Sequence, residues 1–187
     1  KWFVDSLFRV DYNGLNHTIS GIKVDRPGEY RVGFARLITS FRIYNLTLKD
    51  FEVVGGNNVG MLGGGMFKGY LHNVRLYGTV SGDTIVGGIA GYTGNVSFTN
   101  IQDFADVTGK SVVGGVAGNG YTSDLSCSAV HSHVVGDSVV GGLYGLTDTP
   151  RFMTLFNVYM AGDVEARVRG DMLVNDSLAK NSEAPKK

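Results

Sequence analysis

The chain of 187 residues has the length of one domain, and its 43% hydrophobic residues are enough to fill a core. The 17 basic and 17 acidic side chains give a net charge of zero, which disfavours nucleic acid as a partner. The single cysteine, Cys127, excludes an internal disulfide and a cysteine metal cage, and the lack of a long apolar run predicts no membrane insertion.

Residues 1–31 precede the regular part of the sequence. Turn chemistry occurs at Asn13-Gly14 and Pro27-Gly28, and residues 18–24 alternate like a β-strand. The open end of a stacked fold exposes backbone hydrogen-bonding groups. We therefore expect these residues to form an irregular coil that caps the N-terminal end.

Residues 32–170 repeat with a step of 27 residues. Five Gly-rich blocks begin with Val-Gly, and their valines are Val32, Val59, Val86, Val113 and Val140. A second series of valines keeps the same step, each two residues before a glycine, at Val53, Val80, Val107 and Val134. A period between 20 and 50 residues is typical of solenoids. The sequence therefore predicts an all-β fold, a single β-solenoid (β-helix-like) of about five 27-residue coils with an irregular N-terminal cap coil.

Each coil is predicted to contain a Gly-rich block and an alternating strand. The glycines suit a tight bend or a close approach of neighbouring backbones. The strand follows a repeated asparagine that we expect to form a ladder of hydrogen bonds to the backbone at a corner, at Asn45, Asn73, Asn100 and Asn157, with Cys127 in the fourth copy. Alternation predicts one buried face, such as Val74, Leu76, Gly78 and Val80. Asp103 falls on this inward track, and either a bulge or internal pairing would accommodate it.

The fifth copy departs from the period. It has three extra residues within 146–156, a run that contains Phe152, Met153, Leu155 and Phe156. These either cap the C-terminal coil or form an exposed patch for oligomerisation. Residues 171–187 become polar, and we expect a flexible tail or a linker there.

The blocks at 86–91, 113–118 and 140–145, followed by Asn-Val or Asn-Ile and Val-x-Gly, resemble GLUG-motif repeats. The opening residues 11–22 resemble the segment that often precedes such repeats. The resemblance covers roughly residues 9–170. It implies an extracellular β-solenoid used for display or adhesion, because such repeats occur in bacterial surface adhesins and outside the catalytic part of secreted IgA-specific metallopeptidases. The first two copies depart from the motif.

Outward positions of the strands predict a lateral binding face. Stacking the coils places rings and polar groups in columns, formed by Arg75, Tyr77, Gln102, Phe104, Asp106, His131, His133 and Tyr159. Such a face suits a glycan, whose apolar side stacks on rings while planar polar groups bind its hydroxyls. It equally suits a protein partner, since Tyr and Arg are enriched at protein interfaces.

Two less favoured site chemistries involve the same strands. Glu52, Asp106 and Asp163 share one column with His133, but they are too widely separated for a paired-acid glycosidase. His131 and His133 with Asp106 would lack a fourth metal ligand, so no metal site and no cofactor is predicted.

A separate column has alternating charge, and we interpret it as an exposed ion ladder formed by Asp83, Lys110, Asp137 and Arg167.

The predicted function is a non-enzymatic adhesion or receptor- and glycan-binding module, extracellular or on a cell or virion surface, such as a bacterial surface or a phage fibre. Its partners would be a cell-surface glycan or protein receptor, with a homo-oligomer or larger fibre as a further assembly. A polysaccharide-cleaving β-helix enzyme and a structural spacer or assembly module are the alternatives.

Overall fold

The computed structural model describes residues 4–148 and 154–166, so the predicted tail 171–187 lies outside the described residues. Strands form all of the regular structure there, and none of the described segments is a helix able to cross a membrane. The strands are β1 (Val4–Phe8), β2 (Asp11–Ser20), β3 (Lys23–Asp25), β4 (Tyr30–Val32), β5 (Ala35–Val54), β6 (Asn57–Gly60), β7 (Gly63–Ser81), β8 (Thr84–Gly87), β9 (Ala90–Thr108), β10 (Val113–Gly114), β11 (Ala117–Tyr121), β12 (Asp124–Val130), β13 (His133–Gly136), β14 (Val140–Gly141), β15 (Tyr144–Thr147), β16 (Leu155–Met160) and β17 (Val164–Ala166).

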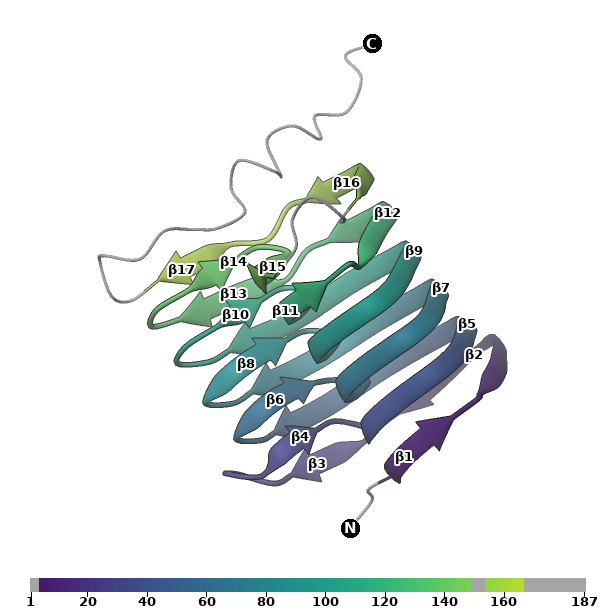
Figure 1. Ribbon diagram of the computed structural model, residues 1–187, viewed down its shortest axis with the longest axis horizontal. Coiled ribbons are helices and arrows are strands. Elements are labelled where there is room, and N and C mark those ends of the chain that lie inside the picture. Colours follow the sequence, from purple (N-terminus) through teal and green to yellow (C-terminus); the bar gives the residue numbers. More distant parts are fainter. Residues whose placement is uncertain (1–3, 149–153, 167–187) are drawn as a thin grey trace.

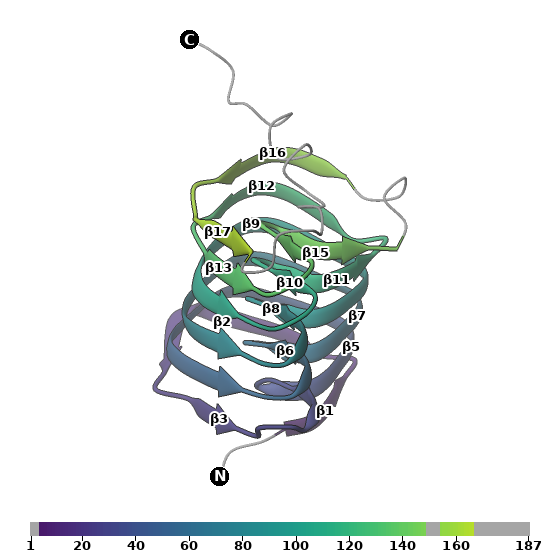
Figure 2. The same ribbon diagram turned by 90° about the vertical axis from the view of Figure 1, so that its left-hand side faces the viewer.

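The strands stack as a β-solenoid of about six turns, which confirms the predicted fold class. A 12-stranded sheet bends around most of each coil, and a 5-stranded sheet in the order β14-β10-β8-β6-β4 closes it. The coils lie one above another along the rod, with the N-terminal coil at one end and β16 and β17 at the other (Figures 1 and 2). Every strand pair is parallel, so equivalent residues of successive coils are direct neighbours.

The register gives the step between coils directly. β7 and β9 pair with a constant step of 27 residues, as in Val74 with Ile101. The first coil is longer, since Val4 pairs with Ala35 and Lys23 pairs with Glu52. β12 pairs with β16 at a step of 30, as in Leu125 with Leu155, which confirms the three-residue insertion in the fifth copy.

The predicted alternation places the core. Val74, Leu76 and Val80 are fully or almost fully buried, as are their counterparts in the neighbouring coils. The Gly-rich blocks allow the two walls of each coil to meet. A Cβ added to Gly87 would lie 2.2 Å from the Ala90 carbonyl oxygen and 2.4 Å from the Ala117 Cα. Close backbone approach is therefore the reason for glycine at this position.

The repeated asparagines form a ladder at one corner of the coil. Asn45, Asn73 and Asn100 have left-handed φ angles of 55°, 51° and 53°, a conformation that Asn tolerates better than most residues. Asn73 Nδ2 donates to Asn45 Oδ1 at 2.7 Å, and Asn100 Nδ2 donates to Asn73 Oδ1 at 3.2 Å. The predicted ladder exists, but its rungs join side-chain amides, whereas the sequence reasoning assigned them to the backbone. Cys127 adopts the same conformation, with a φ of 48°.

Asp103 points into the core, between Leu76 and Val130 of the adjacent coils. It is fully buried, and Oδ1 accepts a hydrogen bond from the Ala105 amide at 3.0 Å. Oδ2 has no hydrogen bond of regular geometry within the described residues, and a Cβ at Gly88 would lie 2.7 Å from it. Burial raises the pKa of Asp103 from 3.8 to about 7, and the Ala105 amide and the Ser132 hydroxyl oppose this rise.

Replacing Asn73 tests the corner ladder. Asn73→Gly keeps the left-handed backbone but removes the side-chain hydrogen bonds to Asn45 and Asn100. We therefore expect the free energy of unfolding to fall by about 1–2 kcal/mol. Asn73→Ala also places a Cβ in the left-handed conformation, which costs about 1 kcal/mol more. Urea denaturation of the two variants and the wild type measures both differences. Equal stability of all three proteins would contradict the ladder.

Asp103 is expected to make stability depend on pH. Its folded pKa of about 7 lies above its ordinary value of 3.8, so the folded protein binds more protons between these values. The free energy of unfolding should therefore lose up to about 4 kcal/mol through Asp103 as the pH rises from about 4 to 7. Urea denaturation at a series of pH values measures this slope. Asp103→Asn should flatten it, whereas the exposed control Asp106→Asn should keep it, and parallel profiles for all three proteins would refute the assignment.

Candidate functional site

The eight predicted site residues lie on one lateral wall of the rod, which we call the ladder face. Arg75 and Tyr77 belong to β7, and Gln102, Phe104 and Asp106 belong to β9. His131 precedes β13, His133 begins it, and Tyr159 lies on β16. Because these strands are stacked in register, the fold brings the predicted residues together on one wall, as expected.

Four aromatic rings are in contact along this wall, and three of them are stacked in parallel. Tyr77 and Phe104 are parallel, with centroids 4.8 Å apart and planes 2° apart. Phe104 and His131 repeat this geometry at 4.8 Å and 3°. The spacing of the rings equals the spacing of hydrogen-bonded strands, so the stack follows directly from the register.

The stack determines which part of each ring a ligand can reach. Both faces of the Phe104 ring point at a neighbouring ring, and its side chain is 36% exposed. A sugar that stacks on an aromatic ring needs a free ring face. The ladder face offers ring edges in the middle of the stack, a geometry better suited to side chains of a protein partner than to a stacked sugar.

Tyr159 reaches the stack diagonally. Its register partner on β12 is Ala129, because the three-residue insertion shifts this coil. The Tyr159 ring contacts His131 edge to face, with centroids 5.9 Å apart and an interplanar angle of 62°. It is 59% exposed and closes the C-terminal end of the stack.

The polar residues of the ladder face flank the rings. Arg75 Nε donates a hydrogen bond of 2.9 Å to Gln102 Oε1, which fixes both side chains beside the Tyr77 and Phe104 rings. Asp106 and His133 are register partners on β9 and β13, and both are exposed. Within the described residues no hydrogen bond or ion pair joins these two side chains, so the pair is open to an external ligand.

The carboxylate column follows the predicted order. Glu52 is a register neighbour of Thr79, which is a neighbour of Asp106 in the next coil. Glu52 Oε1 forms an ion pair of 2.8 Å with Lys23 Nζ, which the repeat of 27 residues did not predict. No group of three His, Cys, Asp or Glu side chains that could hold a metal ion occurs in residues 4–148 and 154–166.

The predicted ion ladder is present in part. Lys110 Nζ and Asp83 Oδ1 form an ion pair between exposed side chains of successive coils. The hydrogen bond to Asp83 and its charge raise the pKa of Lys110. Such exposed pairs contribute little to stability, and Arg167, the last member of the predicted column, lies outside the described residues.

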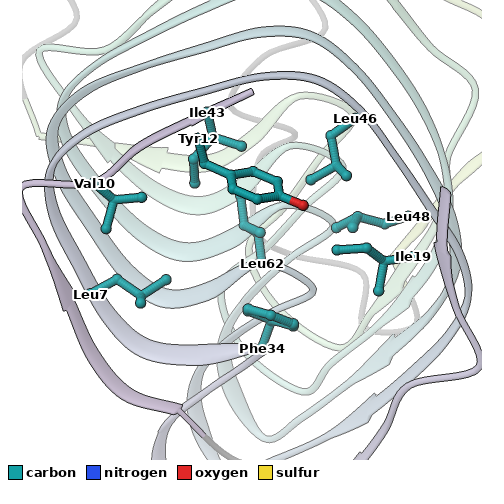
Figure 3. Close-up of a pocket in the computed structure, with 9 residues that line it drawn as sticks. All are labelled: Leu7, Val10, Tyr12, Ile19, Phe34, Ile43, Leu46, Leu48 and Leu62. Atoms are coloured by element: carbon teal, nitrogen blue, oxygen red, sulfur yellow. The ribbon is translucent and has the colours of Figure 1, made fainter. Parts of the chain in front are cut away.

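An apolar cavity of about 230 Å³ occurs inside the coil formed by β1 and β2. Figure 3 shows side chains from these strands, from β5 and from the segments between strands pointing into a common space, formed by Leu7, Val10, Tyr12, Ile19, Phe34, Ile43, Leu46, Leu48 and Leu62. The cavity continues the buried core toward the N-terminal end of the rod. Apart from the Tyr12 hydroxyl, its side chains are all hydrocarbon, so they offer no chemistry for catalysis.

The apolar run in the fifth copy is described only in part. Phe152 and Met153 lie outside the described residues. Leu155 is partly buried against the core, whereas Phe156 is 65% exposed. The choice between a cap and an oligomerisation patch therefore stays a prediction for this run.

Tyr70 is one of several exposed aromatic residues that the sequence did not predict as part of a site. Tyr70 is 60% exposed and lies opposite Arg42 of β5, at a step of 28 residues. A uniform step of 27 would place it opposite the buried Ile43. The register shift between Leu48 and Phe51 was the missing information.

Comparison with known proteins gives one similarity. The chain is 42% identical over 90 residues to halomucin of Haloquadratum walsbyi (strain DSM 16790 / HBSQ001). The match covers 48% of this chain and 1% of halomucin, so the chain spans only a small part of that protein. The similarity to halomucin, together with the β-solenoid, fits a surface repeat protein. No family model and no solved structure matches the chain, and the GLUG motif stays a prediction.

A double-mutant cycle tests the ring stack. Tyr77→Ala and Phe104→Ala each remove one ring, and the pair removes the contact between them. We expect a coupling energy of about 0.5–1.5 kcal/mol in the free energy of unfolding, the usual value for an aromatic pair. The matched cycle of Tyr77→Ala with Tyr70→Ala, two rings on different columns, should give none. Equal coupling in both cycles would contradict the stack.

Proposed function

We propose that this protein is a non-enzymatic adhesion module of an extracellular or cell-surface repeat protein. The stacked coils act as a rigid rod, and the ladder face binds a protein receptor. The single observation behind this proposal is the row of ring contacts on an exposed lateral wall, in which Tyr77, Phe104 and His131 are stacked and Tyr159 meets His131 edge to face. The similarity to halomucin supports the surface location, and the resemblance to GLUG repeats supports the same class.

The chemistry of the ladder face supports a protein receptor. Exposed ring edges together with an arginine are typical of the centre of protein interfaces, where Tyr, Trp and Arg dominate the binding energy. The side chains of the ladder face hold fixed rotamers before a partner binds, because each ring packs on the next and Arg75 donates a hydrogen bond to Gln102. A face ordered before binding loses little conformational entropy when it binds.

The location along the side of the rod is also suited to adhesion. The ladder face uses residues from three or more coils, so its contacts extend parallel to the rod axis (Figure 1). Each added coil extends the face by about 4.8 Å. A rod displayed on a bacterial surface or a phage fibre would therefore present this wall sideways, and several copies would bind with multivalent strength.

Retention on intact cells tests the proposal. We expect the purified protein to be retained on a subset of a panel of bacterial cells, and on far fewer after protease treatment of those cells. Arg75→Glu combined with Tyr159→Ala should reduce retention at least about tenfold, because such side chains commonly contribute 2 kcal/mol or more at an interface. Lys110→Glu, an exposed charge change outside the ladder face, is the matched control and should be retained normally.

The same incubation separates the alternatives. Release of soluble sugar from the cells or from added polysaccharides would overturn the proposal in favour of a polysaccharide-cleaving enzyme. Retention that survives protease treatment but not glycosidase treatment would assign the ladder face to a glycan. Absence of retention across the panel would leave the spacer or assembly function as the better account.

A further inference from the structure

A second lateral wall of the rod contains a groove, separated from the ladder face by the asparagine corner. Two open depressions of about 310 and 530 Å³ adjoin each other on this wall, and Lys68 and Tyr70 line both of them. The first is also lined by Arg9 and Arg42 from the two preceding coils. We call this feature the Tyr70 groove.

The Tyr70 ring differs from the rings of the ladder face because no other aromatic ring covers its faces. Its register neighbours are Arg42 in the coil before and Ser97 in the coil after, and neither is aromatic. The side chain is 60% exposed, and within the described residues it makes no hydrogen bond and no ring contact. A planar or pyranose ring can therefore stack on it.

One end of the groove is cationic. Arg9, Arg42 and Lys68 are exposed there, and Asp11 is the acidic side chain that lines the same depression, which leaves three cations against one carboxylate. Among the described residues, neither Arg42 nor Lys68 forms an ion pair. The Arg9 guanidinium lies 5.1 Å from the Phe8 ring centroid, a contact that orients it. These groups suit a carboxylate or a sulfate.

The other end of the groove presents hydrogen-bonding groups for hydroxyls. Asn95, Ser97 and Asp124 line it. The Asn95 side chain is held by Thr122, whose Oγ1 donates to Asn95 Oδ1 at 2.5 Å. Asp124 is held because Oδ1 accepts the Thr154 amide at 2.9 Å. These two side chains are therefore fixed by their neighbours, and a carboxylate such as Asp124 favours hydroxyl groups and repels anions.

The order of these groups along the rod defines the ligand. We propose that the Tyr70 groove binds an acidic polysaccharide, with a uronate or sulfated sugar at Arg42 and Lys68, a ring stacked on Tyr70, and a neutral sugar at Ser97 and Asp124. Arg42, Tyr70, Ser97 and Asp124 occupy successive coils, so they span about 14 Å, enough for a short oligosaccharide. A nucleic-acid strand also combines rings with anions, but it would bring a phosphate next to Asp124.

The Tyr70 groove is independent of the ladder face. Tyr70 and Tyr77 lie on the same strand, β7, but the left-handed residue Asn73 turns the strand between them, so they lie on different walls of the coil. Glycan binding at the groove would add a second contact to a receptor-binding rod. The groove also remains a binding site if the ladder face proves to have no receptor.

Binding of defined acidic glycans to the purified protein tests the inference. The panel contains oligogalacturonate, oligoalginate, chondroitin sulfate and heparin fragments, together with carboxyl-reduced oligogalacturonate, dextran and poly(U) RNA. We expect calorimetry to detect binding of at least one acidic glycan and none of the carboxyl-reduced or neutral ones. Affinity should fall as salt rises, because the cations of the groove are exposed.

Variants then locate the site. Tyr70→Ala should weaken the acidic glycan at least about tenfold, a change equivalent to 1.4 kcal/mol. Arg42→Ala with Lys68→Ala should do the same and also reduce the salt dependence. The matched controls are Tyr30→Ala, an exposed tyrosine on the small sheet, and Lys110→Glu, a charge change away from the groove, and both should bind as the wild type does.

Three outcomes would overturn the inference. The first is that the protein binds no acidic glycan of the panel. The second is that Tyr70→Ala binds the acidic glycan as tightly as the wild type does. The third is that the protein binds poly(U) and that this binding also depends on Tyr70. Thermal denaturation of each variant shows whether it is folded, and Tyr70→Phe, which keeps the stacking ring, should restore affinity. Cell retention through the ladder face is read separately, so failure of either proposal is recognised on its own.

Discussion

Parallel, in-register stacking of coils is the constraint on which the rest of the structure depends. A single coil cannot bury its apolar side chains or satisfy its backbone hydrogen bonds alone, so each coil is stable only against its neighbours. Stacking also places every side chain about 4.8 Å from its own equivalent. Ladders of asparagine, of aromatic rings and of opposite charges are three results of the same geometry.

The period and the alternation could be predicted from sequence because both are one-dimensional patterns. The valines at a step of 27 residues and the inward track through Val74 and Leu76 needed no knowledge of the coil's shape. Side-chain directions at the corners could not be predicted. Asn73 was expected to bond to the backbone, but the left-handed conformation points its amide at Asn45 and Asn100. Tyr70 was missed for a related reason, since the register shift between Leu48 and Phe51 makes Arg42 its partner in the preceding coil, whereas a uniform step of 27 gives Ile43.

Asp103 shows what the regular pattern tolerates. The equivalent residues in the coils before and after Asp103 are Leu76 and Val130, so a carboxyl group is an exception in an otherwise apolar column. Gly88 leaves space for Oδ2, and the Ala105 amide supports Oδ1. A neutral carboxylic acid in this position costs far less than an ionised one, which is why burial raises its pKa. The residue lies on β9 directly before Phe104, so one strand supplies a buried carboxyl group to the core and a ring to the ladder face.

The same stacking rule separates the two walls by the chemistry they can offer. Where aromatic residues occupy one column in successive coils, as at Tyr77, Phe104 and His131, the rings cover one another and present edges. Where an aromatic residue alternates with polar ones, as at Arg42, Tyr70 and Ser97, no second ring covers its faces, and a cation lies beside it in the column. Edges beside an arginine suit a protein surface, and a free face beside cations suits an acidic sugar. In a solenoid, therefore, the ligand class of a wall depends on whether its columns repeat one residue type or change it from coil to coil.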